Sequence, residues 1–157
     1  MGARWLKNIL ISGSLAQLRD AVEANAARFG FRYFIYRGHF PGGSDVRLDN
    51  CVRGWSEAYG VSRDECDRLL GIDDPYEATP RLWSQMAHGA PGFFARAREL
   101  GLVSGSTHPV HGPGGEWSSV SFVKDYGGAR AESEIRTALA RCQLLATYVH
   151  DGVRRIV

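Results

Sequence analysis

Apolar residues recur at helical spacing in two long segments of the chain. Residues 14–28 carry one apolar stripe, made of Leu15, Leu18, Val22 and Ala26. Residues 132–149 carry a longer one, made of Ile135, Leu139, Cys142, Leu145 and Val149. Ser14 is a suitable N-cap for the first helix, and Gly30 is suited to end it. We therefore predict an amphipathic helix in each segment.

Four segments have the aromatic and β-branched residues, or the alternating pattern, that are typical of strands. They are residues 31–37, 45–48, 105–110 and 117–123. Glycine-rich turns lie within each pair of segments, at residues 41–43 and 112–115. Each pair is therefore expected to form a hairpin. A further helix is predicted for residues 92–100, with Gly101 at its end.

The stretch between the two hairpins predicts shorter helices. One covers residues 50–59. The next begins at Ser62, in a capping-box pattern, and ends at Gly71. A third is expected to start at Asp73-Asp74-Pro75, because aspartate caps helices and proline suits their first position.

The order of elements is therefore helix, two strands, helices, two strands and helix. This order predicts an α+β fold, an α/β/α sandwich in which helices flank a central antiparallel sheet. The length of 157 residues fits a single domain, 1–157, with a substantial core. Hydrophobic residues make up 44% and charged residues 23%, as in ordinary globular proteins.

Charge and cysteine content exclude several function classes. A formal net charge of +2 gives no argument for nucleic acid or for an anionic membrane surface. No apolar run approaches the roughly 20 residues of a membrane span, and no signal peptide is recognisable. The cysteines, Cys51, Cys66 and Cys142, are isolated, so neither zinc nor a disulfide framework is expected. A cytoplasmic location is the simplest expectation.

The candidate chemistry is concentrated at Trp55 and Tyr59, which lie one helical turn apart on one face. Each offers a ring for packing and one N–H or O–H for a ligand. Such a pair suits recognition of a small, partly apolar molecule, although isolated aromatics at this spacing are more often core residues. His108 and His111 lack a third metal ligand, and no Gly-x-Ser-x-Gly motif is present. We expect no enzyme activity, metal or cofactor.

Four segments in order resemble the autoinducer-binding domain of LuxR-type quorum-sensing regulators. Residues 29–34 resemble the entry to the first strand of that family, and Trp83-Ser84 resembles its second tryptophan. Asn50, Trp55 and Tyr59 resemble its Asn-Tyr-Pro-x-x-Trp-x-x-x-Tyr pattern. Residues 93–116 are the strongest match. Each segment alone has low specificity, whereas the ordered set is highly specific.

This resemblance implies that an N-acyl-homoserine lactone binds between the sheet and the helices. Trp55 would donate its indole N–H to the lactone carbonyl, and Tyr59 would line the acyl-carbonyl side. Trp83 would pack against the lactone ring, and Ser121 would hydrogen-bond the acyl carbonyl. Gly105 and Thr107 would sit on the facing strand. The expected walls of the acyl site are Tyr33, Ile35 and Val110.

The chain departs from the family pattern at two positions. Cys51 stands where the family often has tyrosine, so one hydroxyl contact is missing. The aspartate that accepts the ligand amide N–H is expected nine residues after the tyrosine, where this chain has Arg68. Asp74 is the preferred replacement, and Asp73 and Asp64 are alternatives. If none of them serves, the ligand is not a standard acyl-homoserine lactone.

The resemblance also implies partners. The parent protein would be a ligand-dependent transcription regulator, expected to form a homodimer. DNA would be contacted only through a C-terminal helix-turn-helix domain that this chain lacks, and no membrane partner is expected. The alternative is a module derived from this family that dimerises or sequesters a partner without ligand.

Overall fold

The computed structural model of the chain describes residues 4–43, 45–51 and 78–157. The strands are β1 (Tyr33–His39), β2 (Asp45–Asp49), β3 (Arg81–Leu82), β4 (Ser104–His111) and β5 (Trp117–Lys124). The helices are α1 (Lys7–Ile11), α2 (Leu15–Arg28), α5 (Trp83–Met86), α6 (Pro91–Glu99) and α7 (Ala129–Ile156). Single 3-10 turns cover Arg4–Leu6, Ala87–Gly89 and Pro113–Gly115.

The five strands form one antiparallel sheet in the order β2-β1-β5-β4-β3. Both predicted hairpins are present, as β1–β2 and β4–β5. The hairpins join through β1 and β5, whose register places Ile35 opposite Ser121. Strand β5 therefore lies at the centre, with a neighbour on each side. The predicted α+β fold with an antiparallel sheet is confirmed.

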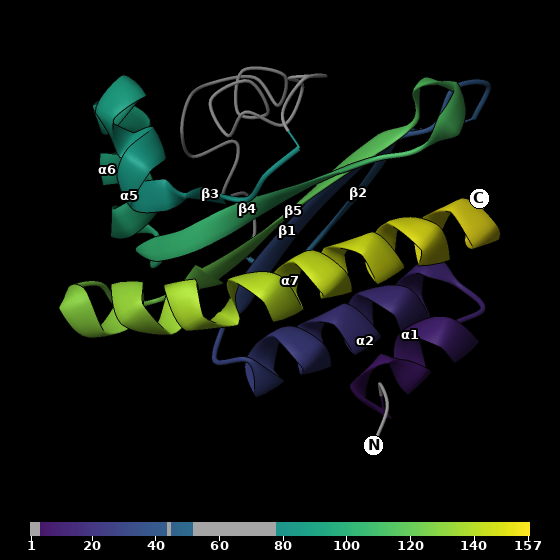
Figure 1. Ribbon diagram of the computed structural model, residues 1–157, viewed down its shortest axis with the longest axis horizontal. Helices are drawn as coiled ribbons and strands as arrows, with labels where there is room; N and C mark the ends of the chain where they lie inside the picture. Colours follow the sequence, from purple (N-terminus) through teal and green to yellow (C-terminus); the bar gives the residue numbers. More distant parts are fainter. Residues whose placement is uncertain (1–3, 44, 52–77) are drawn as a thin grey trace.

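Helices cover the two faces of this sheet unequally (Figure 1). Helices α1, α2 and α7 lie together over one face, the α7 face, where their side chains pack on Phe34, Tyr36 and Phe122. The other face, the α6 face, carries Ile35 and Val123. A smaller apolar cluster forms there with Trp83 of α5, Phe93 and Ala97 of α6, and Leu102. Since side chains alternate along a strand, β1 and β5 each contribute to both clusters.

The ends of two helices confirm the expected caps. The Ser14 hydroxyl accepts a hydrogen bond from the Gln17 N–H at 3.1 Å, which satisfies one donor of the first turn of α2. Gly30, with φ at +89°, ends α2, and Gly101, with φ at +85°, follows α6. In each case the next residue donates its N–H to a carbonyl five positions back, in the Schellman arrangement.

Other predicted boundaries need correction. Helix α7 is longer at both ends than residues 132–149. The predicted helix at residues 50–59 does not include Asn50 and Cys51. The Asn50 side chain instead forms hydrogen bonds with the backbone at the start of β1. Its Oδ1 accepts from the Phe34 N–H at 2.8 Å, and its Nδ2 donates to the Arg32 carbonyl at 3.0 Å. The rest of that segment and the helices expected up to residue 77 lie outside the described residues.

A buried histidine joins α7 to β4. His108 has no exposed surface, and its Nδ1 and Nε2 lie 3.1 Å from Gln143 Oε1 and 2.7 Å from Ser106 Oγ. Gln143 Nε2 in turn donates to the Pro109 carbonyl at 2.9 Å, which fixes Oε1 as an acceptor for an Nδ1–H. Burial lowers the pKa of His108 to about 4, although the bond to Gln143 opposes this shift. The ring is therefore neutral at neutral pH.

This histidine predicts an acid-sensitive core. Unfolding exposes His108, whose pKa returns to about 6.5, so between pH 6.5 and 4 the unfolded chain binds more protons than the folded chain. The free energy of unfolding should fall as pH drops through this window, by up to about 1.4 kcal/mol per pH unit from this one site. Urea unfolding at several pH values measures the slope. In His108→Gln the slope should be smaller, and an unchanged slope would contradict the assignment.

Candidate functional site

Three of the residues selected from the sequence form one hydrogen-bonded chain on the α6 face. Trp83 Nε1 donates to Thr107 Oγ1 at 3.0 Å, and Thr107 Oγ1 lies 2.7 Å from Ser121 Oγ. All three side chains are buried, with 3%, 2% and 0% of their surface exposed. We call this group the Trp83–Thr107–Ser121 cluster.

Strand register explains why these residues meet. Thr107 of β4 lies opposite Ser121 of β5, and Ser121 lies opposite Ile35 of β1. On the other side of β4, Thr107 lies opposite Arg81 of β3, two residues before Trp83 begins α5. A row of side chains thus crosses the sheet on one face. Trp83, the first residue of α5, directs its indole N–H to Thr107 in this row.

The hydroxyl pair has one proton more than its mutual bond uses. Thr107 and Ser121 have two hydroxyl protons between them, and one of these is enough for the 2.7 Å bond. The Trp83 N–H already occupies an acceptor position on Thr107. Whichever hydroxyl donates within the pair, the other keeps a proton for a further acceptor. The cluster is therefore suited to hold a carbonyl oxygen.

Apolar side chains surround this cluster. Ile35 and Val123 flank Ser121 on the sheet, and the Trp83 ring meets Phe94 edge-on at 5.2 Å between centroids. Tyr33 packs at the margin of the same apolar group, and its hydroxyl accepts from Arg32 Nε at 3.2 Å. A few polar atoms in an apolar surround are typical of sites for small molecules.

Gly105 and Cys51 also border the α6 face. Gly105 lies opposite Val123, and a Cβ at that position would collide with the Phe122 carbonyl oxygen, so the glycine allows the strands to approach. Cys51 packs against the apolar cluster, and its Sγ lies 3.8 Å from the Phe34 carbonyl. Burial, with the nearby Asp49 charge, raises the pKa of the Cys51 thiol, which stays protonated.

Val110 does not join these residues. It is three positions from Thr107 along β4, so its side chain points to the α7 face and packs against the main core. Val110 therefore lies on the opposite face of the sheet from Thr107, Ser121 and Ile35. Trp55, Tyr59 and Asp74, and the alternative acids Asp64 and Asp73, lie outside the described residues.

Comparison with known proteins supplies the family. The sequence profile described as "Autoinducer binding domain" matches residues 73–153, about half of the chain. The chain belongs to the autoinducer-binding domain family. Trp83, Gly105, Thr107 and Ser121 all lie within the matched range. This family comprises ligand-binding domains of regulators and is not a family of enzymes. Among curated proteins, no sequence matches the chain.

Solved structures of autoinducer-binding relatives share the fold. The N-acylhomoserine lactone-dependent LuxR-family transcription factor CepR2 of Burkholderia cenocepacia superposes with a TM-score of 0.75 at 20% identity, covering 97% of this chain and 93% of that one. SdiA in complex with octanoyl-rac-glycerol gives 0.71 at 17% identity, covering 96% and 64%. The solution structure of Escherichia coli SdiA residues 1–171 gives 0.68 at 18% identity, covering 96% and 91%.

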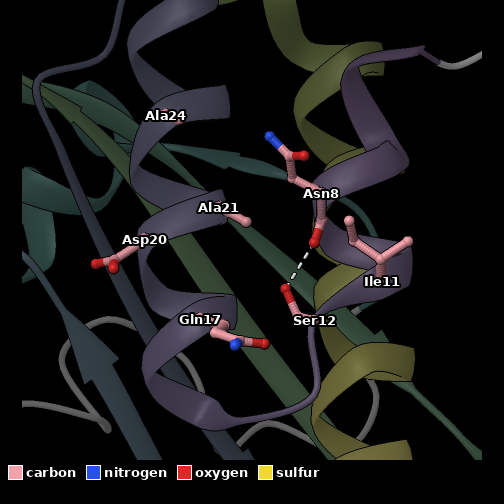
Figure 2. Close-up of a pocket in the computed structure, with 7 residues that line it drawn as sticks. All are labelled: Asn8, Ile11, Ser12, Gln17, Asp20, Ala21 and Ala24. Carbon is pink, nitrogen blue, oxygen red and sulfur yellow. Dashed lines mark hydrogen bonds between the residues drawn. The ribbon is translucent and has the colours of Figure 1, made fainter.

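Two of the cavities among the described residues differ in how close they lie to the Trp83–Thr107–Ser121 cluster. One, of about 500 Å³, lies between α1 and α2 (Figure 2), with Asn8, Ile11 and Ser12 facing Gln17 and Ala21. It contains none of the residues selected from the sequence. The other, of about 360 Å³, lies beside the Trp83–Thr107–Ser121 cluster, where Trp83 and Phe94 form its wall together with Gly127 and Gly128 before α7.

A serine–histidine–glutamate chain on the α7 face was missed from the sequence. Ser118 Oγ hydrogen-bonds both the Tyr36 hydroxyl and His150 Nδ1, and His150 Nε2 lies 3.0 Å from Glu116 Oε1. Arg154 donates to the same Glu116 oxygen at 2.9 Å. The order of groups is that of a hydrolase triad. Ser118 is 1% exposed and lies beneath α7, so these bonds anchor the helix to the sheet.

Two other site types find no support in the described parts of the chain. No group of three or more histidine, cysteine or acidic side chains there is placed to hold a metal ion. No helix there combines the length and apolar character needed to cross a bilayer.

The cluster predicts a stability cost that depends on one hydroxyl. Thr107→Val removes the hydroxyl that bonds both the Trp83 N–H and the Ser121 hydroxyl, and leaves these two groups buried. The free energy of unfolding should therefore fall by about 1–3 kcal/mol. Urea unfolding measures this loss. The matched control is Thr137→Val, because the Thr137 hydroxyl only bonds the Ser133 carbonyl on the exposed surface of α7. The control should change stability by less than about 0.5 kcal/mol, and equal losses in both variants would contradict the proposed bonds.

Proposed function

We propose that this domain is the sensor of a quorum-sensing transcription regulator, and that it binds an N-acyl-homoserine lactone or a related small amphiphile on the α6 face. The observation that carries the proposal is the Trp83–Thr107–Ser121 cluster. It places one unused hydroxyl proton among apolar side chains. An amide or ester carbonyl at the head of an acyl chain is a matching acceptor.

The energetics favour such a ligand over a fully polar one. Each buried apolar carbon of an acyl chain contributes about 0.8 kcal/mol when it leaves water. The hydrogen bond to the hydroxyl pair adds about 0.5–1.5 kcal/mol net. It also sets the ligand's orientation, because a chain bound the other way round would leave its carbonyl unpaired in an apolar surround.

The remaining polar contacts are assigned by resemblance to the family. Trp55 donates its indole N–H to the lactone carbonyl, and Tyr59 lines the acyl-carbonyl side. Asp74 accepts the amide N–H, with Asp73 and Asp64 as alternatives. A carboxylate bound to an amide N–H contributes about 1.5–3 kcal/mol, so a ligand that lacks this donor is rejected.

The ligand class is supported by the descriptions of two structures with the same fold. CepR2 is described as dependent on N-acylhomoserine lactone, and SdiA has been solved with octanoyl-rac-glycerol. Both descriptions name an acyl group attached to a compact polar head. The apolar surround of the hydroxyl pair here suits the same combination.

We propose that the regulator itself extends beyond this domain. The chain covers 64% of the SdiA chain in the octanoyl-rac-glycerol complex. We propose that the sensor domain acts in a cytoplasmic homodimer, and that DNA is contacted by a separate C-terminal helix-turn-helix domain. The second candidate, a ligand-independent dimerisation or sequestering module, is favoured by Cys51 and Arg68, which replace two polar contacts of the family pattern.

Thermal melting with a series of acyl-homoserine lactones tests the proposal. A ligand that binds only the folded state at a hundred times its Kd stabilises by about 2.7 kcal/mol, which raises the melting temperature by several degrees. At least one chain length should give this shift. A cooperative melt that no lactone shifts would contradict ligand sensing and favour the ligand-independent module.

Variants then assign the polar contacts. Trp55→Phe and Ser121→Ala should each remove one hydrogen bond to the ligand and weaken binding about tenfold, measured by calorimetric titration. Asp74→Asn should weaken it more than Asp73→Asn or Asp64→Asn, because only the acceptor loses a charge-assisted bond. Ser133→Ala, on the exposed side of α7, is the control and should bind as the parent does. Unchanged affinity in Ser121→Ala would remove the hydroxyl pair from the site.

A further inference from the structure

A third serine of β5 has no hydrogen-bond partner among the described residues. Ser119 is 1% exposed, and its Oγ is buried and unpaired. Its neighbours in the strand are satisfied: Ser118 bonds Tyr36 and His150, and Ser121 bonds Thr107. Buried hydroxyls in proteins are nearly always paired, so the exception requires an explanation.

Ser119 shares a face with the proposed ligand contacts. It lies two residues from Ser121 along β5, so both side chains point to the α6 face, about 6.6–6.8 Å apart along the strand. Ser118, in contrast, points to the α7 face, where its bonds to Tyr36 and His150 lie. The unpaired hydroxyl is therefore one strand repeat beyond the hydroxyl pair.

The surroundings of Ser119 differ from those of Ser121. Ser121 lies beside Ile35, whereas Ser119 lies opposite Arg37 of β1. The Arg37 guanidinium lies 5.8 Å from the Trp117 ring centroid, and its Nη2 lies 3.4 Å from Asp45 Oδ2. This side chain is largely buried, at 11% exposure, so its positive charge is close to the same face. The α6 face thus changes from apolar to charged toward the hairpin tip, where the guanidinium and the Asp45 carboxylate lie together.

We propose that Ser119 is a second hydrogen-bonding contact for the ligand, and that the acyl chain of the natural ligand carries an oxygen in mid-chain. The inference rests on the proposed function, since it takes the ligand to be an acyl amphiphile whose carbonyl meets Ser121. The distance of one strand repeat places the oxygen several bonds beyond that carbonyl. A wholly aliphatic chain would leave the Ser119 hydroxyl buried and unpaired.

The neighbouring charge selects the kind of oxygen. Ser119 can donate or accept, but a guanidinium on the next strand favours a group with electron density directed toward it. A keto oxygen meets both demands, and a hydroxyl oxygen meets them when its proton points away. The ligand class is therefore an acyl amphiphile with a mid-chain keto or hydroxyl group.

Calorimetric titration with three lactones of equal chain length tests this proposal: N-octanoyl-homoserine lactone and its 3-oxo and 6-oxo derivatives. The parent protein should bind the 6-oxo compound about tenfold more tightly than the octanoyl compound, as one added hydrogen bond predicts. Ser119→Ala should abolish this preference without weakening octanoyl binding. Ser118→Ala is the matched control on the opposite face and should keep the preference, whatever its effect on stability.

The outcomes separate this inference from the function on which it rests. Binding of the octanoyl compound without any preference, or a preference for the 3-oxo compound alone, overturns the role of Ser119 and leaves the proposed function standing. A 6-oxo preference that persists in Ser119→Ala also overturns it. If none of the lactones binds a protein that melts cooperatively, the proposed function and this inference fall together.

Discussion

The central strand β5 is buried on both faces, and this constraint determines how the rest of the domain is built. Its side chains are shielded from water on the α7 face by helices and on the α6 face by the smaller cluster. A polar side chain on such a strand must find a partner within the protein or a ligand. Ser118 and Ser121 of β5 have partners within the protein, whereas Ser119 has none among the described residues.

The two faces consequently have different roles. On the α7 face, polar groups are paired in full: Ser118 with Tyr36 and His150, and His108 with Gln143. These bonds fix the position of α7 on the sheet, and the apolar core around them is buried. On the α6 face, the hydroxyls of Thr107 and Ser121 have one proton that their mutual hydrogen bond does not use. The paired groups on the α7 face thus keep the sheet rigid for the recognition proposed on the α6 face.

Membership of the autoinducer-binding domain family is consistent with this division. A sensor for an amphiphile needs an apolar wall for the chain and a small number of fixed polar groups for the head. Strand register supplies the fixed positions here, because Ile35, Ser121 and Thr107 are held in one row by backbone hydrogen bonds. Under the proposed function, we expect that changing the side chains along this row, or along the next one through Ser119, alters ligand preference without altering the fold.

Local patterns predicted most of the elements because their signals are local. The apolar stripe of α2, the cap at Ser14 and the glycines that end helices each depend on neighbouring residues only. Helix α1 and strand β3 were missed because five and two residues are too short to show a period. The pairing of β1 with β5 joins distant parts of the chain, and no local pattern encodes it.

In the candidate site, too, local patterns identify residues, whereas long-range strand pairing determines their contacts. Ser121, Thr107 and Trp83 were selected by resemblance, but their mutual hydrogen bonds depend on the register of β3, β4 and β5. Strand alternation alone separates Val110 from Thr107, so the sequence pattern already places the two side chains on opposite faces. The unpaired state of Ser119 becomes visible only once the partners of its neighbours are known.

Methyl NMR during a lactone titration tests the central claim, that the ligand binds on the α6 face of the sheet, most directly. The account predicts large shifts for the methyl groups of Ile35, Thr107 and Val123, which lie on that face. It predicts small shifts for Val120 and Val149, which lie in the core beneath α7. Shifts confined to Val120 and Val149, or to Ile11 beside the cavity between α1 and α2, would contradict it.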